Sequence, residues 1–335
     1  MVKRVTTTSG KKKKQKLINV SLKSLAGAKG FWFALVFAGF GSYFWYSSYA
    51  ATGWQLVWQD TFGAATLSST DWQIYQGPEN HSQAVYTANN VSTQNDYAVL
   101  KTRRHCITTP SEPLTSANDT SNPCPAGTAT KYSSGQIRSL YRWKSGRIEI
   151  RARLPRAQKG QWPALWMRNQ SDWCNLNYGE LDIVEWYYDT KISGTMKQTL
   201  GRNNATSHAT CELADGTSGV TKMVKHYEDY DTDLTASFHT FAVEWDATAV
   251  VYEMDGKRLR YENRATSPDG DAYKTTKDDF PVTAPRFSAI MNQSWELRAQ
   301  TQIIKPGDAY HSAPDNTKPF YSYTMLIDSV KIFQK

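Results

Sequence analysis

The chain has 335 residues, of which 40% are hydrophobic and 13% aromatic, enough for one large folded domain with additional segments. Residues 1–30 contain nine of its 39 Lys and Arg and no acidic residue, so they account for the formal net charge of +8. The other 30 basic residues nearly balance 31 Asp and Glu, which excludes a basic face that binds nucleic acid.

The N-terminal residues indicate export. Residues 1–30 contain no aromatic residue and many Lys, Thr and Ser, which predicts a disordered cytoplasmic tail. Residues 31–50 form an apolar run, and no charged residue occurs between Lys29 and Asp60. A basic flank before an apolar run is typical of an export signal. Two outcomes stay open: cleavage after Ala50 gives a secreted protein, and retention gives a membrane anchor, since about 20 residues span a bilayer.

Residues 51–335 are predicted to form one antiparallel β-domain. Many short strand candidates, together with 19 Tyr and 12 Trp, are typical of an all-β sandwich. The clearest strand is 146–155, in which charged residues alternate with apolar ones, and Asp255-Gly256 predicts a tight hairpin turn. The strand candidates are 54–62, two within 85–103, 135–138, 146–155, 161–167, 179–186, 196–200, 238–245, 250–254, 257–261, 287–292 and 323–333.

The four cysteines fit an exported chain, because an even number of cysteines there indicates disulfides. Three pairings are possible. We favour Cys106–Cys124, which closes the loop predicted at 107–130, and Cys174–Cys211, which braces the loops around 179–186. No close pair of Cys or His indicates a metal site, and none of the six histidines is assigned a role.

Three carboxylates lie within six residues of the strand candidate 179–186. Side chains alternate along a strand, so Glu180 and Asp182 share a face and Glu185 is out of phase. A β-bulge near residues 183–184 restores its phase. Clustered carboxylates raise one another's pKa values, and glycoside hydrolysis with retention needs one neutral and one ionised carboxyl group roughly 5 Å apart. An exposed strand with surface acids is the alternative interpretation.

The hexapeptide Glu-Leu-Asp-Ile-Val-Glu resembles the E-[IL]-D-x-x-E signature of glycoside hydrolase family 16 in its bulged, laminarinase-like form. The lichenase-like form lacks the extra residue. Thr61 stands where the family's first strand usually has Glu. The resemblance covers roughly 54–334 and is carried further by Trp54–Phe62, Ser145–Pro155, Gln161–Met167 and Phe238–Trp245.

The resemblance implies a concanavalin-like jelly-roll β-sandwich with a cleft across its concave sheet. It implies Glu180 as nucleophile, Glu185 as general acid/base and Asp182 as the residue that holds the nucleophile. It also implies a structural Ca²⁺ at Asp328, although a solvated carboxylate fits that position equally well.

Sugars need flat aromatic platforms beside hydrogen-bonding groups. The substrate-binding candidates are Trp162, Trp166, Tyr187, Asn292 and Trp295. Trp186 is predicted to lie in the core, because it follows the inward-facing Glu185.

The sequence therefore predicts an exported, retaining endo-glycoside hydrolase of β-glucan, with β-1,3-glucan as the preferred substrate. We expect a monomer that needs no cofactor for catalysis, and whose partners are a polysaccharide and, if residues 31–50 are uncleaved, a membrane. A transglycosylase or a hydrolase of galactans such as agar or carrageenan is the alternative within enzymes. A carbohydrate-binding sandwich without activity is the alternative of another class.

Overall fold

The structure is a computed structural model that describes residues 53–79, 82–155, 158–171, 178–188, 196–205, 227–228, 234–263, 289–307 and 312–335. The chain divides into two units, Met1–Trp54 and Gln55–Lys335, and all elements described below belong to the second. The predicted tail and apolar segment lie outside the described residues. Among the residues that are described, no helix is long and apolar enough to cross a membrane.

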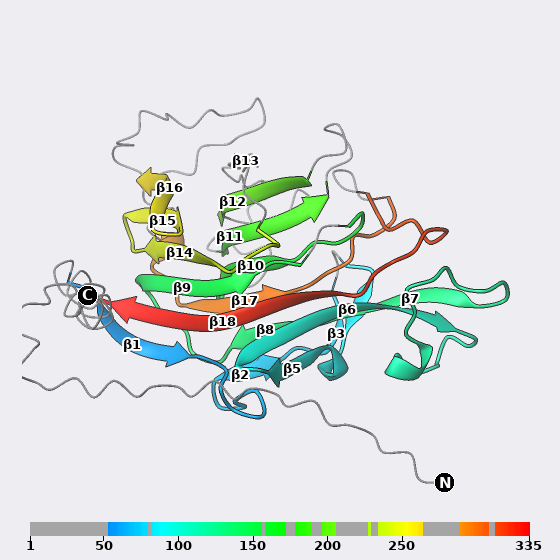
Figure 1. The fold of residues 1–335 in the computed structure, drawn as a ribbon. Coiled ribbons are helices and arrows are strands. Elements are labelled where there is room, and N and C mark those ends of the chain that lie inside the picture. The colour runs from blue at the N-terminus through cyan, green and yellow to red at the C-terminus, as the bar shows by residue number, and fades with distance from the viewer. Residues whose placement is uncertain are drawn as a thin grey trace, which may run out of the picture. The chain divides into compact units, whose positions relative to one another are not determined.

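The second unit is a sandwich of two β-sheets, shown in Figure 1. Within the described residues, eleven strands form one sheet and seven form the other. The eleven-stranded sheet contains β1 (Gln55–Asp60), β3 (Gly77–Pro78), β4 (Ala84–Tyr86), β5 (Val91–Gln94), β6 (Tyr97–Ile107), β7 (Ala129–Ser134), β9 (Gly146–Arg153), β14 (His239–Trp245), β15 (Ala249–Met254), β16 (Lys257–Asn263) and β18 (Tyr323–Gln334). The seven-stranded sheet contains β2 (Trp72–Ile74), β8 (Gln136–Ser139), β10 (Ala164–Asn169), β11 (Gly179–Tyr188), β12 (Met196–Ala205), β13 (Tyr227–Glu228) and β17 (Trp295–Gln300).

The strand order places the acidic strand near the middle of the smaller sheet. That order is β13-β12-β11-β10-β17-β8-β2, so β11 pairs with β12 on one side and with β10 on the other. Two short 3-10 helices, η2 (Ala88–Asn90) and η3 (Ser116–Asn118), lie in connections of the larger sheet. The all-β sandwich predicted from the sequence is confirmed.

The hydrophobic core lies between the two sheets. One contiguous cluster of buried side chains takes Ile148 and Ile150 from β9 of the larger sheet and Leu165 and Leu181 from the smaller sheet. The alternation predicted for β9 is confirmed, because its apolar side chains enter this cluster. Burying apolar surface is the main favourable term in folding, so the apolar residues of each strand determine which face lies in the core and which face is turned away from it.

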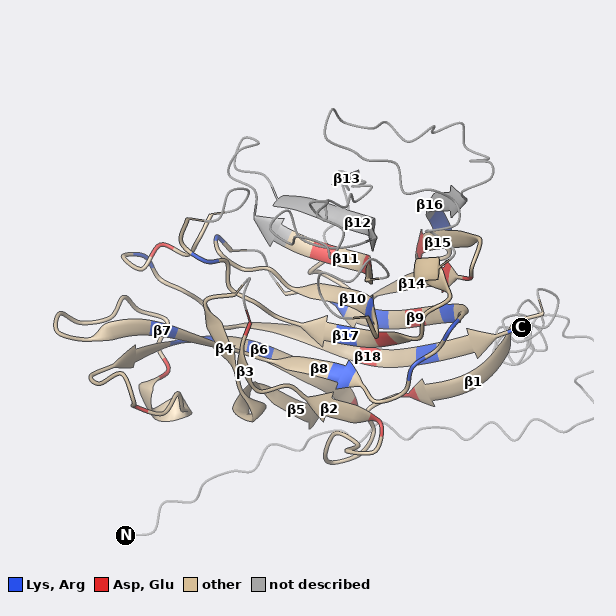
Figure 2. Cartoon of the chain, turned by 180° about the vertical axis from the view of Figure 1, so that it is seen from behind, with Lys and Arg blue, Asp and Glu red and all other residues tan. Residues whose placement is uncertain are grey.

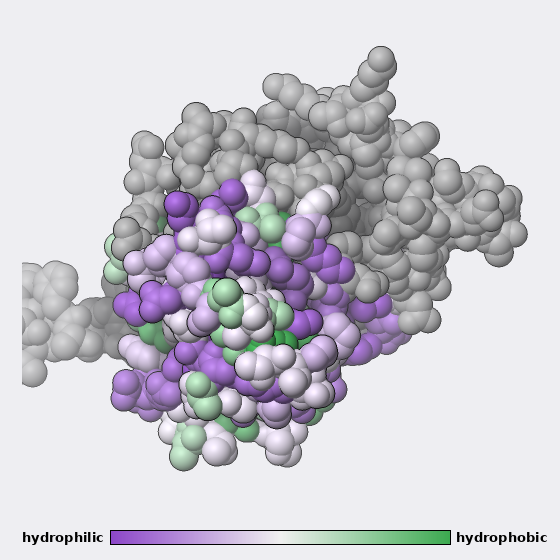
Figure 3. Space-filling view, turned by 90° about the vertical axis from the view of Figure 1, so that its right-hand side faces the viewer, coloured by the Kyte–Doolittle hydropathy of each residue, from purple (hydrophilic) through white to green (hydrophobic). Residues whose placement is uncertain are grey.

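The outer face of β9 carries charged residues, which Figure 2 shows along the strand. Arg147 is buried on that face and pairs with Glu149 at 2.8 Å, Glu244 at 2.6 Å and Glu253 at 2.7 Å. A guanidinium with five N–H donors can satisfy several carboxylates at once. Figure 3 shows a largely hydrophilic surface on the face turned toward its viewer, with small apolar areas.

The strand predicted at 287–292 is wrong in its described part. Ala289 to Met291 form a helical turn. The carbonyls of Ala289 and Ile290 accept hydrogen bonds from the Gln293 side chain and backbone, and the Met291 carbonyl accepts one from the Trp295 indole. Local partners therefore satisfy backbone groups that a strand would have paired with a neighbouring strand.

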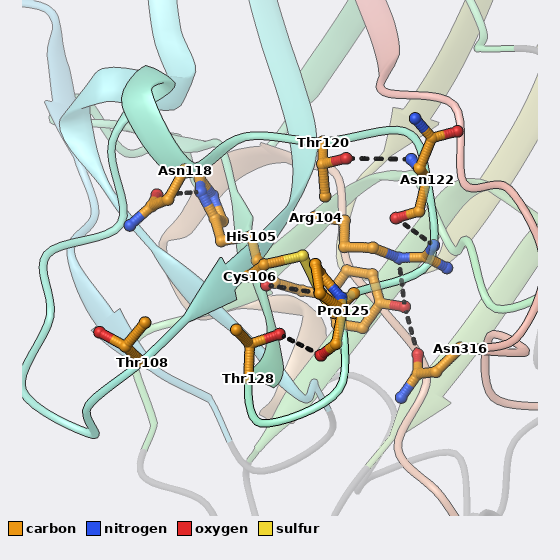
Figure 4. The surroundings of a disulfide bond; sticks show 12 residues. Arg104, His105, Cys106, Thr108, Asn118, Thr120, Asn122, Pro125, Thr128 and Asn316 are labelled. Carbon is orange, nitrogen blue, oxygen red and sulfur yellow. Dashed lines mark hydrogen bonds between the residues drawn. A yellow bond between two sulfur atoms is a disulfide. The ribbon is translucent and has the colours of Figure 1, made fainter.

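The disulfide Cys106–Cys124 is confirmed and joins the end of β6 to the long connection before β7, as Figure 4 shows. Next to it, the buried Arg104 donates to the carbonyls of Asn122 and Lys318 at 3.3 and 2.9 Å. The covalent link and the guanidinium together hold this connection against the larger sheet. Cys174 and Cys211, the second predicted pair, lie outside the described residues.

Candidate active site

The pairing of β10 with β11 contains the irregularity that the acidic sequence requires. Leu165 is paired with Val184, and the next residue, Trp166, is paired with Asp182. Ile183 is therefore the extra residue on β11. The predicted β-bulge near residues 183–184 is confirmed, and it shifts the alternation of side chains by one position from that point on.

This bulge places the three carboxylates on one face of the smaller sheet. Paired residues of neighbouring strands point to the same side, and β10 pairs Arg168 with Glu180, Trp166 with Asp182, and Ala164 with Glu185. These three β10 residues alternate regularly, so their three partners share a face. We call this side of the sheet the carboxylate face. Figure 2 shows the acidic residues of β11 in red.

The opposite face of β11 belongs to the core. Leu181, Ile183, Val184 and Trp186 are all buried in the cluster between the sheets. The core position predicted for Trp186 is confirmed. Buried apolar residues on both sides of Asp182 and of Glu185 fix the strand against the core and set the orientation of these two acids.

Glu185 is held by an indole. Its side chain is almost fully buried, with 5% of its surface exposed, and the Nε1–H of Trp162 donates to Glu185 Oε1 at 3.0 Å. Trp162 itself is partly exposed and comes just before β10. The sequence placed this tryptophan among the substrate contacts, whereas the structure gives it a direct contact with the proposed proton donor.

Glu180 is partly exposed and is held by a phenol. The Tyr178 hydroxyl donates to Glu180 Oε2 at 2.7 Å, and Tyr178 is buried. Burial, and then the neighbouring Glu180 carboxylate, raises the pKa of the Tyr178 phenol far above its usual value. The phenol therefore stays protonated and serves as a donor. Asp182, only 3% exposed, lies between the two glutamates on the same face.

Gly179 precedes the nucleophile candidate because there is no room for a side chain. A Cβ there would lie 2.5 Å from Ile290 Cγ2 and 2.7 Å from the ring of Trp295. Real Cβ atoms do not approach other atoms this closely, so a larger residue would move the strand. The core thus fixes the backbone immediately before Glu180.

A network of polar side chains continues the carboxylate face onto β17 and β8, and sequence reasoning missed it. Glu296, Arg298 and Gln300 pair with Arg168, Trp166 and Ala164 of β10, and Arg298 and Gln300 in turn pair with Arg138 and Gln136 of β8. All five residues of β17 and β8 therefore lie on the same face as the acids. In the sequence, these polar residues belong to two strands that lie far apart, and in each strand they alternate with core residues.

The network is tightly bonded. Glu296 accepts from Arg298 Nε at 2.7 Å and from Arg142 Nη2 at 2.6 Å. The Gln136 amide donates to Gln300 Oε1 at 2.6 Å. The guanidinium of Arg298 lies 4.7 Å from the centre of the Trp166 ring, within range of a cation–π interaction. Such a fixed polar surface beside an aromatic ring suits a ligand that has both hydroxyl groups and apolar faces.

The remaining substrate candidates differ in outcome. Trp166 is partly exposed on the carboxylate face, as predicted. Asn292 is exposed in the turn that follows the helical residues. The side chain of Tyr187 lies outside the described residues. The prediction for Trp295 is wrong: its side chain is 0% exposed, and it pairs with Asn169 on the core side of the sheet. Its neighbour Glu296 takes the outward position.

Asp328 pairs with a cation of the protein itself. Its Oδ1 lies 3.1 Å from Arg151 Nη1, and Ser329 donates to its other oxygen at 3.2 Å. A guanidinium beside the carboxylate disfavours a second cation there. Among the described residues, no group of three or more His, Cys, Asp or Glu is arranged to hold a metal ion. The calcium site inferred from resemblance stays a prediction, and these residues do not fit it well.

Comparison with known protein families shows to which family this chain belongs. The model of the glycosyl hydrolases family 16 matches residues 78–293, more than half of the chain. The chain belongs to this family. It is therefore a glycoside hydrolase, and the three carboxylates of β11 lie within the matched region.

Family members of known activity are related to this chain at low identity. A glucan endo-1,3-beta-glucosidase of Cryptopygus antarcticus is 25% identical over 232 residues, covering 65% of this chain and 73% of that protein. A beta-glucanase of Rhodothermus marinus is 26% identical over 301 residues, covering 85% and 86%.

Solved structures agree on the fold. The catalytic domain of a laminarinase from Thermotoga petrophila has a TM-score of 0.56 and 21% identity, covering 84% of this chain and 98% of that one. A structure from work on endo-acting O-glycanases of human gut microbiota, which initiate mucin breakdown, has a TM-score of 0.59 and 22% identity, covering 84% and 91%.

Proposed function

We propose that this family 16 enzyme is an endo-acting hydrolase of β-1,3-glucan that retains the configuration of the cleaved bond. The observation that carries the proposal is the bulge at Ile183, which brings Glu180, Asp182 and Glu185 to one face. The relatives named as endo-1,3-beta-glucosidase and beta-glucanase support the substrate class.

The reaction proceeds by double displacement. Glu180 attacks the anomeric carbon and the bond to the leaving oxygen breaks, while Glu185 transfers its proton to that oxygen. A covalent glycosyl-enzyme results. Glu185, now a carboxylate, takes a proton from water, and the water oxygen attacks the anomeric carbon and releases Glu180. Trp162 donates to one oxygen of Glu185, and Tyr178 donates to one oxygen of Glu180.

The substrate lies across the strands of the smaller sheet. Trp166 is partly exposed on the carboxylate face, and its ring offers an aromatic surface for the apolar face of a sugar. The network of β17 and β8 provides hydroxyl-binding groups on the side of β10 away from β11.

The test is a product assay with the purified full chain on laminarin, mixed-linkage glucan, agar and carrageenan. We expect oligosaccharides from laminarin, and we expect Glu180→Gln to abolish their release while the protein stays folded. Release at the wild-type rate by Glu180→Gln would overturn the proposed function. Products from agar or carrageenan alone would move the substrate to galactans, and transfer products in place of hydrolysis would make the enzyme a transglycosylase.

We also propose that the chain is exported through residues 31–50. The basic tail before this apolar run supports the orientation, with the tail in the cytoplasm and the hydrolase domain outside. N-terminal sequencing of the mature protein, together with membrane fractionation, separates a cleaved signal from an anchor. An intact N-terminus in the soluble cytoplasmic fraction would contradict export.

A further inference from the structure

Two side chains beside Glu180, those of Tyr178 and Arg168, form a chain of contacts that leads to this carboxylate. Tyr178 immediately precedes β11 and lies two residues before Glu180, and its side chain reaches the Glu180 carboxylate. The phenol donates to Glu180 Oε2 at 2.7 Å. The ring of Tyr178 is 2% exposed, so the position of this donor is fixed by packing.

Arg168 fixes the phenol in turn. Its guanidinium carbon lies 5.1 Å from the centre of the Tyr178 ring, and its Nη2 donates to the Ser171 carbonyl at 3.1 Å. Arg168 also pairs directly with Glu180 across the two strands. Glu180 therefore has on one side a phenol from the residue just before β11, and on the neighbouring strand β10 the arginine that packs on this phenol.

We propose that Tyr178 is a positioning residue that acts on the second half of the reaction, by stabilising Glu180 as it leaves the glycosyl-enzyme. This inference rests on the proposed function, because it requires Glu180 to be the nucleophile. Arg168 supports Tyr178 by packing on its ring.

The direction of the effect follows from the charge on Glu180 in each step. During glycosylation the carboxylate loses its negative charge, and a hydrogen bond to it becomes weaker. During deglycosylation the carboxylate regains its charge, and the same bond becomes stronger. Hydrogen bonds to charged groups are stronger than those between neutral groups, and only interactions that strengthen toward a transition state accelerate that step. Tyr178 therefore favours the release of the sugar from the enzyme.

The experiment compares Tyr178→Phe with the wild-type full chain on a dinitrophenyl β-laminarioligosaccharide. With this leaving group the first step is fast and the second limits kcat. We expect kcat to fall about 10- to 100-fold, with KM falling in parallel and kcat/KM changing less than about threefold. Intact-mass measurement of the quenched reaction should show the glycosyl-enzyme accumulating in the variant.

Tyr132→Phe is the matched control. Tyr132 is also 2% exposed, its hydroxyl also donates at 2.7 Å, to Asn316 Oδ1, and the Arg104 guanidinium lies 5.8 Å from its ring centre. It lies on β7 of the larger sheet and contacts none of the three carboxylates in the described structure. We expect its kcat and KM to equal those of the wild type.

Three results would overturn the inference: an unchanged kcat in a folded Tyr178→Phe, a loss in kcat/KM as large as the loss in kcat, or an equal loss in Tyr132→Phe. If Tyr178→Phe does not fold by thermal unfolding, Arg168→Met gives the second test, with the same split between kcat and KM expected at smaller size. None of these results tests whether Glu180 is the nucleophile. That assignment is tested separately by Glu180→Gln and is wrong if this variant stays active.

Discussion

The indole N–H of Trp162 donates to Glu185 Oε1 at 3.0 Å, which joins the segment leading into β10 to the last of the three acids on β11. Ala164 is the partner of Glu185 across the two strands and follows Trp162 by two residues. The proposed proton donor is thus oriented by a group from outside its own strand.

Replacing Trp162 by Phe should mainly harm substrates whose leaving group must be protonated. We expect kcat/KM on laminarin to fall about tenfold, the effect of one lost hydrogen bond to a charged group. The dinitrophenyl substrate needs little help from an acid, so its kcat/KM should fall much less. Trp245→Phe is the control, because Trp245 donates to the Lys144 carbonyl at 3.1 Å and lies on the larger sheet. An equal loss on both substrates would contradict the orienting role of the Trp162 bond.

Deleting Ile183 should preserve the chemistry. The remaining sequence Glu-Leu-Asp-Val-Glu alternates regularly, so all three acids share a face without a bulge. We expect measurable laminarin hydrolysis and a lower melting temperature, because Ile183 is a buried core residue. Deleting both Ile183 and Val184 should instead abolish activity, because Glu185 then directly follows Asp182 and points to the opposite face of the strand. An active variant that lacks both residues would show that phase does not position Glu185.

His105 should make the folded state sensitive to mild acid. It is fully buried, with its ring nitrogens 2.9 Å from Asn118 Oδ1 and 2.7 Å from Ser133 Oγ. Burial lowers the pKa of His105 below its usual value of about 6.5. Below that pH the unfolded chain binds a proton at His105 more readily than the folded chain does. The contribution of His105 to the free energy of unfolding is therefore complete above about pH 6.5 and declines as the pH falls below it.

His105→Gln removes this titration. Thermal unfolding between pH 7 and pH 5 should show a smaller loss of melting temperature in the variant than in the wild type, whatever the difference at pH 7. Identical pH dependence in the two proteins would show that His105 does not contribute.

Removing the confirmed disulfide should cost stability and leave catalysis intact. Cys106 and Cys124 are separated by 18 residues, and closing a loop of this size contributes about 3 kcal/mol to the free energy of unfolding in the chain-entropy model. The double replacement Cys106→Ser with Cys124→Ser is compared with the wild type by denaturant unfolding. Because the bond lies on the larger sheet, kcat on laminarin should not change at 25 °C. An unchanged unfolding midpoint would mean that the contacts of Arg104 hold the connection without the disulfide.

The sequence predicted the site where the evidence was local. The phase of Glu180, Asp182 and Glu185 required one extra residue, and the structure places it at Ile183. Trp186 followed from the same phase and lies in the core. Cys106–Cys124 followed from the loop that the bond closes.

What could not be predicted depends on contacts between distant segments. Trp295 was expected on the cleft side, but at the start of β17 its side chain enters the core, and Glu296 faces outward in its place. The network of Glu296, Arg298 and Gln136 joins strands that are about 160 residues apart, and only the pairing of β8 with β17 brings them together. The hydrogen bond between Tyr178 and Glu180 was not predicted, because the spacing of two residues in the sequence does not show whether their side chains meet.

The most direct measurement is chemical rescue of Glu185→Ala by azide, with a dinitrophenyl β-laminarioligosaccharide as substrate. If the bulge turns Glu185 to the side of Glu180, the variant forms a glycosyl-enzyme slowly released by water, and azide enters the vacated space. The account predicts a rate that rises with azide concentration and a glycosyl azide of β-configuration. No rescue by azide, or an azide product of α-configuration, would contradict it.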